Sequence, residues 1–295
     1  SSDPASKPFV AAVYYYAVLD RVSRIAGLLD RPAERDRYGD LARRVRARIN
    51  DLHLRREGGT AFYDNGSQSA NAHALFFGLV PAGDRDAVAE SLLARIRADG
   101  TNTTGFLGLM CLLQVLADIG RNDLAYALVT NPNPGGWLHM VRKRDLTTLA
   151  EDFDVDTFAD RYLVPASLNH AFLGGSLSAW LFRHLAGIQP RSPGYREISI
   201  RPYLPDGLDS ASAAIDTRYG IIAASWRRLG PDRLVLDLDI PHGTTAVVTV
   251  PAARPDRVTC REFGAGDLAA RLAGCDGHTV SFRLGSGACR LEVGP

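Results

Sequence analysis

The sequence predicts a two-domain protein, in which helical hairpins over residues 1–189 are followed by an antiparallel β-sandwich over residues 190–295. Three observations predict this class. The chain has 295 residues, and most single domains hold about 100–200. Apolar residues recur every three or four positions up to Ala186, and they alternate with polar residues beyond Pro190. The first period is typical of amphipathic helices, and the second of strands with one buried face.

The helical part is expected to be built from paired helices. The apolar stripe over residues 9–30 predicts a long helix, and Pro32 opens a second one with an arginine-rich outer face, so the two should pack as an antiparallel hairpin. A loop at Gly58 and Gly59 follows. Further helices are expected over residues 67–79, 84–97, 104–119, 122–130 and 166–186. The helix over 104–119 is apolar on almost every side, which predicts burial between neighbours.

The β part is predicted by runs of period two and by the residues that separate them. Alternating runs occupy residues 197–201, 234–240 and 246–250. They are broken by Pro202, Pro205, Gly220, Pro231, Pro241 and Pro251. This spacing favours an antiparallel sandwich, with a domain boundary near residues 189–193.

Charge and hydropathy exclude several classes of partner. The 34 Lys and Arg residues are offset by 33 Asp and Glu residues, and the resulting net charge of +1 predicts no binding to nucleic acid or to an acidic membrane surface. Four arginines between positions 43 and 48 are expected to form a solvated helix face. No run of about 18 apolar residues occurs, and the first residues have no signal architecture. The localisation stays open, with the cytoplasm slightly favoured.

The four cysteines do not have the spacing of a metal site or of a disulfide framework. Cys111 lies in an apolar helical run and is expected to be buried. Cys260, Cys275 and Cys289 fall in the β segment, where one pair could form a bridge, and the sequence does not decide which.

Motifs for several other chemistries are missing from the sequence. There is no nucleophile elbow, no phosphate-binding loop and no dinucleotide fingerprint. His73 and His139 have no partner at metal-ligand spacing, so both are interpreted as structural, and no cofactor or metal is expected. Of Tyr14, Tyr15 and Tyr16, at most one can face a pocket, because consecutive helical residues point in different directions.

An ordered series of short segments resembles the later part of family 78 bacterial α-L-rhamnosidases. The segments are DPASK at 3–7, FVAAVYYY at 9–16, TTGFLG at 103–108, DLAY at 123–126, GWLHMV at 136–141, TTLAE at 147–151, Asn169-His170, AGIQP at 186–190, IRP at 200–202, Tyr219-Gly220 and Ser225-Trp226. The resemblance implies that residues 1–189 form the second half of a six-hairpin (α/α)6 toroid, and that residues 190–295 are the C-terminal β domain. It also implies an inverting glycoside hydrolase that releases terminal α-L-rhamnose from rhamnosides.

The resemblance assigns the general base to Glu151, the glutamate of the Thr-Thr-x-x-Glu segment. An inverting glycosidase needs one carboxylic acid to protonate the leaving oxygen and one carboxylate to deprotonate the attacking water. The alternative is an exposed surface glutamate in the acidic run that continues with Asp152, Asp154 and Asp156.

Two further site residues follow from the same resemblance. His170 matches the family's Asn-His pair, whose imidazole hydrogen-bonds rhamnose hydroxyls or steadies the base; the alternative is a structural histidine. Trp137 is a candidate apolar wall for the sugar, since a deoxy sugar presents a methyl group and a C–H face to aromatic rings. The alternative for Trp137 is a core tryptophan.

The sequence departs from the family in two ways. The segment that holds the family's general acid lies upstream of residue 1, and no residue here matches it. Ala150 stands where the family has an aromatic residue, and Asp152 and Phe153 stand where it has Arg-Trp. We therefore expect this chain alone to be nearly inactive, because proton transfer contributes about 10²–10⁴-fold to the rate. Uncovered helix faces would favour a missing N-terminal half or self-association.

Three hypotheses remain open. The chain is part of a rhamnosidase acting on rhamnose-containing glycosides or polysaccharides, a diverged carbohydrate-binding or scaffold protein without activity, or another carbohydrate-active enzyme with an α/α toroid. The sequence does not indicate the aglycone, the linkage or the oligomeric state.

Overall fold

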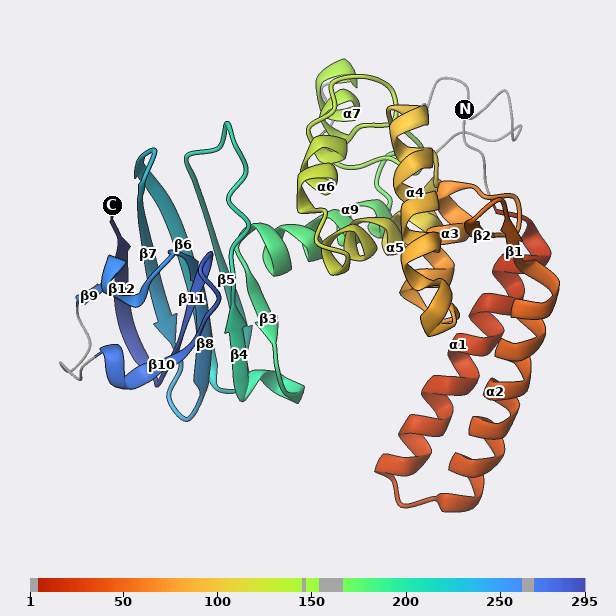
Figure 1. Ribbon diagram of the computed structural model, residues 1–295, viewed down its shortest axis with the longest axis horizontal. Coiled ribbons are helices and arrows are strands. Elements are labelled where there is room, and N and C mark those ends of the chain that lie inside the picture. The colour runs from red at the N-terminus through yellow and green to blue at the C-terminus, as the bar shows by residue number, and fades with distance from the viewer. Residues whose placement is uncertain (1–4, 145–146, 154–166, 262–267, 295) are drawn as a thin grey trace. The chain divides into compact units, whose positions relative to one another are not determined.

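The computed structural model describes residues 5–144, 147–153, 167–261 and 268–294 (Figure 1). The chain divides into two compact units, Ser1–Leu177 and Ser178–Pro295. Helical hairpins make up the first unit and antiparallel-rich sheets the second, which confirms the predicted fold class. Within the described residues the helices do not close into a complete toroid.

Paired helices dominate the first unit. They are α1 (Lys7–Leu28), α2 (Pro32–His53), α3 (Gln68–Phe76), α4 (Arg85–Asp99), α5 (Gly105–Asp118), α6 (Asn122–Val129), α7 (Trp137–Arg144) and α9 (Ala171–Trp180), the last of which crosses into the second unit. The predicted helices up to residue 130 begin and end within a few residues of these bounds. Helix α5 buries seven residues, including Cys111, as its apolar sequence predicts.

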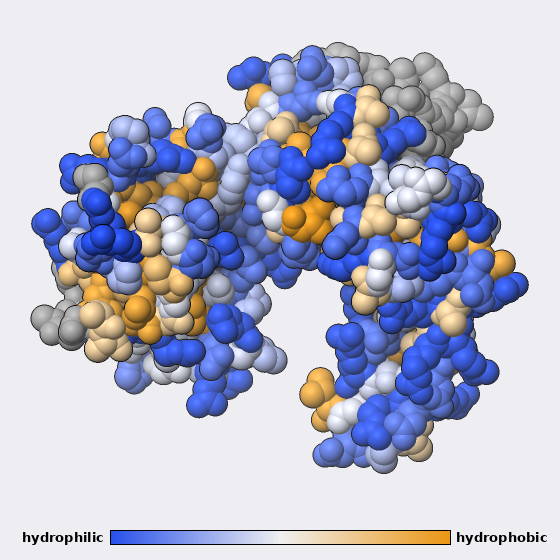
Figure 2. All heavy atoms as spheres, in the orientation of Figure 1, coloured by the Kyte–Doolittle hydropathy of each residue, from blue (hydrophilic) through white to orange (hydrophobic). Residues whose placement is uncertain are grey.

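Helices α1 and α2 form the predicted antiparallel hairpin (Figure 1). Proline stands in the first turn of each helix, where its missing N–H has no intrahelical partner to lose. Val13 and Ala17 face inward, whereas Ile25 and Leu28 are exposed by 54% and 84%. Figure 2 shows hydrophobic atoms at the tip of this hairpin. The outer arginines are solvated except Arg46, whose guanidinium donates to the carbonyls of Leu79 and Val80 at 3.1 and 3.2 Å.

The chain differs from the sequence-based expectation between α2 and α3. Instead of a simple loop, β1 (Leu54–Glu57) and β2 (Thr60–Tyr63) form a short antiparallel hairpin. Gly58 and Gly59 form its two-residue turn with φ of +56° and +83°, a conformation that glycine adopts without steric cost. Three of the four residues in β1 are exposed, so the sequence lacks the alternation of apolar and polar residues that would predict a strand here.

The second unit contains two five-stranded sheets. One sheet has the order β10 (Leu272–Cys275), β11 (Thr279–Leu284), β8 (Thr245–Pro251), β4 (Glu197–Ile200) and β3 (Ile188–Pro190), and the other has β5 (Ser210–Thr217), β6 (Gly220–Gly230), β7 (Arg233–Ile240), β12 (Gly287–Val293) and β9 (Val258–Arg261). Every described pairing is antiparallel except that of β4 with β8. A π-helical turn, Leu181–Leu185, precedes β3.

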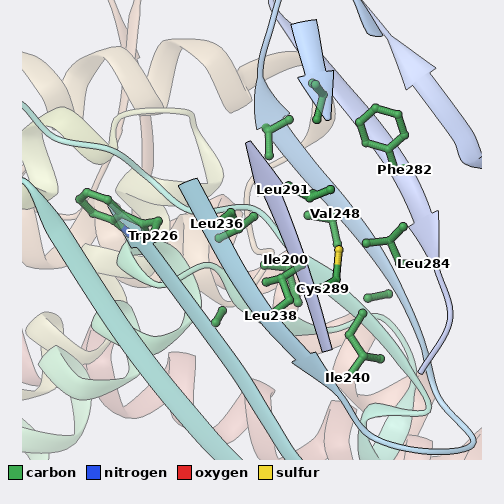
Figure 3. Packing of buried hydrophobic residues seen from close by; sticks show 14 of the residues in the cluster. Ile200, Trp226, Leu236, Leu238, Ile240, Val248, Phe282, Leu284, Cys289 and Leu291 are labelled. Atoms are coloured by element: carbon green, nitrogen blue, oxygen red, sulfur yellow. The ribbon is translucent and has the colours of Figure 1, made fainter. Parts of the chain in front are cut away.

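The core of the second unit lies between its two sheets (Figure 3). Ile200, Val248 and Phe282 come from one sheet, and Leu236 and Leu291 from the other, all with 0% exposure. Burying each such side chain contributes about 1.5–3 kcal/mol. The indole N–H of Trp226, at the edge of this core, donates to the carbonyl of Leu185 at 2.8 Å. Burial alternates along β4 and β8, which explains why the alternation of apolar and polar residues in the sequence predicted these two strands.

Candidate functional site

Two segments of the first unit, residues 147–153 and 167–170, run beside each other and carry two of the predicted site residues. The Glu151 N–H donates to the Ser167 carbonyl at 2.8 Å, and the His170 N–H donates to the Leu149 carbonyl at 2.7 Å. The Thr148 hydroxyl adds a third link, to the Leu168 carbonyl at 2.6 Å. The structure therefore places Glu151 and His170 on adjacent backbone segments, although they are 19 positions apart in the sequence.

The carboxylate of Glu151 is partly exposed and is oriented by its neighbour. Its Oε2 accepts a hydrogen bond from the backbone N–H of Ser167 at 3.2 Å. Hydrogen bonds to an ionised group are stronger than those between neutral groups, so this contact restrains the side-chain rotamer. A carboxylate has about four lone-pair sites, so one such bond leaves acceptor capacity for a water molecule.

His170 is positioned from the other side by an aromatic ring. Its imidazole lies edge-on to the ring of Phe106, with centroids 5.2 Å apart and an interplanar angle of 66°. Phe106 is the second residue of α5, so the buried helix of this unit supports the imidazole. Edge-to-face packing of this kind contributes about 0.5–1.5 kcal/mol beyond buried area, and it fixes the ring plane.

Trp137, the third predicted site residue, packs against the 147–153 segment. It is only 2% exposed, and its ring packs edge-on against Phe153 at 5.2 Å. One turn along α7, the sulfur of Met140 accepts a hydrogen bond from the Ala150 N–H at 3.2 Å. Both contacts attach α7 to the segment that carries Glu151, and the burial of Trp137 favours a packing role over a sugar-facing wall.

A tight loop before α7 sets the position of that helix. A Cβ atom on Gly136 would lie 2.1 Å from the carbonyl oxygen of Asn131, and one on Gly135 would lie 2.2 Å from the Thr101 hydroxyl. Only glycine, which has no Cβ atom, fits at positions 135 and 136 without a clash. The Thr101 hydroxyl also donates to the Pro134 carbonyl at 2.7 Å. The loop therefore fixes the first turn of α7.

The remaining histidine candidates have structural contacts. The Nδ1 of His73 donates to the Ser69 carbonyl at 2.7 Å, and burial lowers the pKa of this completely buried side chain. Nδ1 of His139 lies 3.0 Å from the Pro132 carbonyl. Among the described residues, no three His, Cys, Asp or Glu side chains come together as a metal site.

No described helix is long and apolar enough to cross a membrane.

Of the consecutive tyrosines, Tyr14 turns inward. Its ring lies edge-on to that of His73 at 5.9 Å, and burial raises the pKa of its hydroxyl to about 12. Tyr15 is 52% exposed. This agrees with the expectation that consecutive helical residues point in different directions.

Sequence reasoning missed the supporting residues of the site. Phe106 and Ser167 gave no motif signal of their own, although Phe106 falls in one of the matching segments. Phe153 was noted only as a departure from the family. Their roles depend on contacts between segments that are distant in the chain. Asp154 and Asp156, the other members of the acidic run, lie outside the described residues.

Comparisons with known proteins show the family to which the chain belongs. Residues 1–185 match the family model for the bacterial alpha-L-rhamnosidase 6 hairpin glycosidase domain, and residues 187–262 match the model for the C-terminal domain of the same proteins. Helical hairpins followed by an antiparallel-rich β unit thus define the six-hairpin glycosidase class. The chain belongs to the bacterial α-L-rhamnosidase family.

Individual relatives cover nearly the whole chain. The α-L-rhamnosidase of Streptomyces avermitilis is 32% identical over 295 residues, which is 99% of this chain and 27% of the relative. The crystal structure of that organism's α-L-rhamnosidase complexed with L-rhamnose has a TM-score of 0.83 at 31% identity, and covers 97% of this chain and 26% of that one. The α-L-rhamnosidase structure from Dictyoglumus thermophilum has a TM-score of 0.82 at 25% identity, covering 96% of this chain and 31% of that one. The chain therefore spans about a quarter to a third of these relatives.

Proposed function

We propose that this chain supplies the general-base part of an inverting α-L-rhamnosidase, with Glu151 as the base. The observation that carries the proposal is the partly exposed Glu151 carboxylate, held by the Ser167 N–H on a segment adjacent to His170. Membership of a rhamnosidase family gives the reaction class. Terminal α-L-rhamnose of glycosides or polysaccharides is the proposed substrate.

In the proposed reaction, Glu151 removes a proton from a water molecule that attacks the anomeric carbon. The carbon–oxygen bond to the aglycone breaks on the opposite face, where a second carboxyl group protonates the leaving oxygen. For inversion, the two carboxyl groups stand about 6.5–9.5 Å apart, which leaves room for the water. The proposal places that acid outside this chain, since no residue of the sequence matches the family's acidic segment.

The proposal gives His170 and Trp137 different roles. The imidazole of His170, oriented by Phe106, contacts rhamnose hydroxyls or steadies the Glu151 carboxylate. Trp137 has a packing role, in which its ring supports Phe153 of the segment that carries Glu151. Its 2% exposure leaves little surface for contact with a sugar. The catalytic part is assigned to residues 1–189 and the β domain to residues 190–295.

The test is hydrolysis of an aryl α-L-rhamnoside by this chain and by any longer protein encoded in the same reading frame. We expect activity only in the longer protein, with β-L-rhamnose as the first anomer seen by proton NMR. Glu151→Gln should lower kcat by at least about 10²-fold, because a carboxamide does not accept the proton. Asp152→Asn is the matched control, since it removes the neighbouring carboxylate.

Small anions provide a second readout for the base. In Glu151→Ala the space left by the carboxylate admits azide, which needs no deprotonation and should restore turnover with a rhamnosyl azide product. Loss of activity in Asp152→Asn but not in Glu151→Gln would place the base elsewhere. An α-anomeric first product would overturn the inverting mechanism.

A non-catalytic carbohydrate-binding role is the second candidate, favoured by the departures at Ala150, Asp152 and Phe153. It predicts that the longer protein binds L-rhamnose without hydrolysing any aryl rhamnoside. Calorimetric titration with L-rhamnose, run beside the activity assay, separates the two functions.

A further inference from the structure

Two cysteines in the β unit lie in direct contact across neighbouring strands. Cys260 is on β9 and Cys289 is on β12, and their sulfur atoms are 3.2 Å apart. Both are free thiols in this structure. We propose that Cys260 and Cys289 form a disulfide bond when the protein meets a disulfide oxidant, and that this bond fastens strand β9 to the β-sandwich.

The register of the sheet places the two side chains on one face. Cys260 stands opposite Leu291, and Cys289 lies two residues before Leu291 on β12. Alternate residues of a strand share a face, and Leu291 points into the core with 0% exposure. Both thiols therefore face the inside of the sandwich, and Figure 3 shows the sulfur of Cys289 among the apolar side chains there.

Closing the bond requires a small movement of β9. A disulfide bond is about 2.05 Å long, so the sulfur atoms must approach by roughly 1 Å. Diagonal neighbours in a regular ladder have Cα atoms about 7–8 Å apart, slightly more than most disulfides span. Strand β9 is at the edge of its sheet and pairs only with β12 among the described strands, so it can shift toward β12 without breaking a ladder to a third strand.

The two thiols differ in accessibility, which sets the order of the chemistry. Cys260 is partly exposed, whereas Cys289 is buried and 3% exposed. Burial, together with the contact to Cys260, raises the pKa of the Cys289 thiol. Cys260 is therefore the thiol that an oxidant reaches, and Cys289 is the thiol that resolves the intermediate.

With oxidised glutathione as the oxidant, the reaction is two thiol–disulfide exchanges. The Cys260 thiolate attacks one glutathione sulfur, which breaks the glutathione disulfide and releases one glutathione thiolate. The Cys289 thiol loses its proton to solvent and attacks the Cys260 sulfur, which releases the second glutathione. The protein is oxidised by two electrons, and one glutathione disulfide is reduced to two thiols.

The bond would restrain the unfolded chain and the sheet edge together. The two cysteines are 29 positions apart, and this stretch includes β10 and β11 of the opposite sheet. Cross-linking a loop of this length restricts the unfolded ensemble substantially. We expect the thermal midpoint of the β unit to rise by about 5 °C or more on oxidation.

Peptide mapping tests the proposal directly, because the three β-unit cysteines fall in different tryptic peptides. Cys260 lies in residues 258–261, Cys275 in 272–283 and Cys289 in 284–290. The full chain is equilibrated with oxidised glutathione, its free thiols are alkylated, and it is digested without reductant. We expect the 258–261 and 284–290 peptides to be linked and two of the four thiols to be lost.

Matched serine variants separate this pair from non-specific oxidation. Cys275→Ser should keep the linked peptides and the rise in thermal midpoint, because Cys275 lies on β10 in the other sheet. Cys260→Ser should abolish both. Alkylation of Cys260 and Cys289 after full equilibration, or linkage of either one to Cys275, would overturn the proposal.

Discussion

Glu151 and Ser167 hold each other through two hydrogen bonds. The Glu151 N–H donates to the Ser167 carbonyl at 2.8 Å, and the Ser167 N–H donates to Oε2 of the Glu151 carboxylate at 3.2 Å. One bond aligns the backbones and the other orients the proposed base. The base is therefore positioned by a residue 16 positions further along the chain.

Replacing Ser167 by proline should weaken the proposed active site. Proline has no N–H, so Ser167→Pro removes the donor to Oε2 of Glu151. Hydrogen bonds to charged groups contribute about 1.5–3 kcal/mol, which corresponds to a loss of about 10- to 100-fold in kcat. Aryl α-L-rhamnoside hydrolysis by the catalytically competent protein measures the effect.

Ser167→Ala is the control, since it keeps the backbone N–H. It loses only the bonds of the hydroxyl, which donates to the Asn169 carbonyl at 3.2 Å and accepts from the Asn169 N–H at 3.3 Å. We expect its kcat to stay within about threefold of wild type, because the Ser167 N–H that donates to Oε2 of Glu151 is retained. Equal losses in the two variants would show that the Ser167 N–H does not orient the base.

Asp64 should give the helical unit a pH-dependent stability. Its carboxylate accepts hydrogen bonds from the Ser6 N–H at 2.7 Å and the Ser6 hydroxyl at 2.8 Å, and lies 3.2 Å from Nδ1 of His53. Burial raises the pKa of Asp64, but the hydrogen bonds from Ser6 and His53 outweigh it and leave the pKa lowered. The contacts connect the start of α1 with the end of α2.

Because the folded pKa of Asp64 is lowered, its contribution is fully present above the unfolded value of about 3.9 and is lost as the pH falls below it. We expect Asp64→Asn to reduce the free energy of unfolding by about 2 kcal/mol at neutral pH. The difference from wild type should shrink below about pH 4. Urea unfolding followed by helical circular dichroism checks this, and an unchanged difference at low pH would contradict it.

Gly187 should be intolerant of any side chain. Its φ is +85°, and a Cβ atom there would lie 2.3 Å from the Pro202 nitrogen and 2.4 Å from the Arg201 carbonyl carbon. Both neighbours are backbone atoms, so no rotamer change relieves the clash. We expect Gly187→Ala to reduce the free energy of unfolding of the β unit by about 3 kcal/mol or more.

Gly207→Ala separates the clash from backbone strain. Gly207 has a similar φ of +78°, and no atom lies within 4 Å of the position that an alanine methyl group would take. Alanine there should cost only about 1–2 kcal/mol. Urea unfolding followed by tryptophan fluorescence compares the two variants, and equal losses would rule out the contact with residues 201 and 202 as the cause.

The regular elements were predictable where one face of an element is buried. Along β8, buried and partly buried residues alternate strictly up to Val250, and the sequence shows the same period. In α5 the near-continuous apolar run predicted burial, and Leu109, Leu112 and Leu116 have 0% exposure. The β1–β2 hairpin was missed because β1 is mostly exposed and hydrophobic periodicity carries no signal there.

The site was predictable only in part. The Thr-Thr-x-x-Glu segment and the Asn169-His170 pair identified Glu151 and His170 as candidates, and Trp137 was open between wall and core. The contacts of Phe106 with His170 and of Phe153 with Trp137 join segments up to 64 positions apart. Such contacts leave no period or spacing in the sequence.

The sequence by itself determined the two-part architecture and the family, and it indicated Glu151 as a candidate base, because burial periodicity and short motifs are local properties of the chain. The tertiary structure alone decided that Ser167 orients Glu151, that Trp137 is buried, and that Cys260 meets Cys289 rather than Cys275. These facts depend on which distant segments pack together. Packing is set by the sum of many weak contacts across the fold, and no single local pattern encodes it.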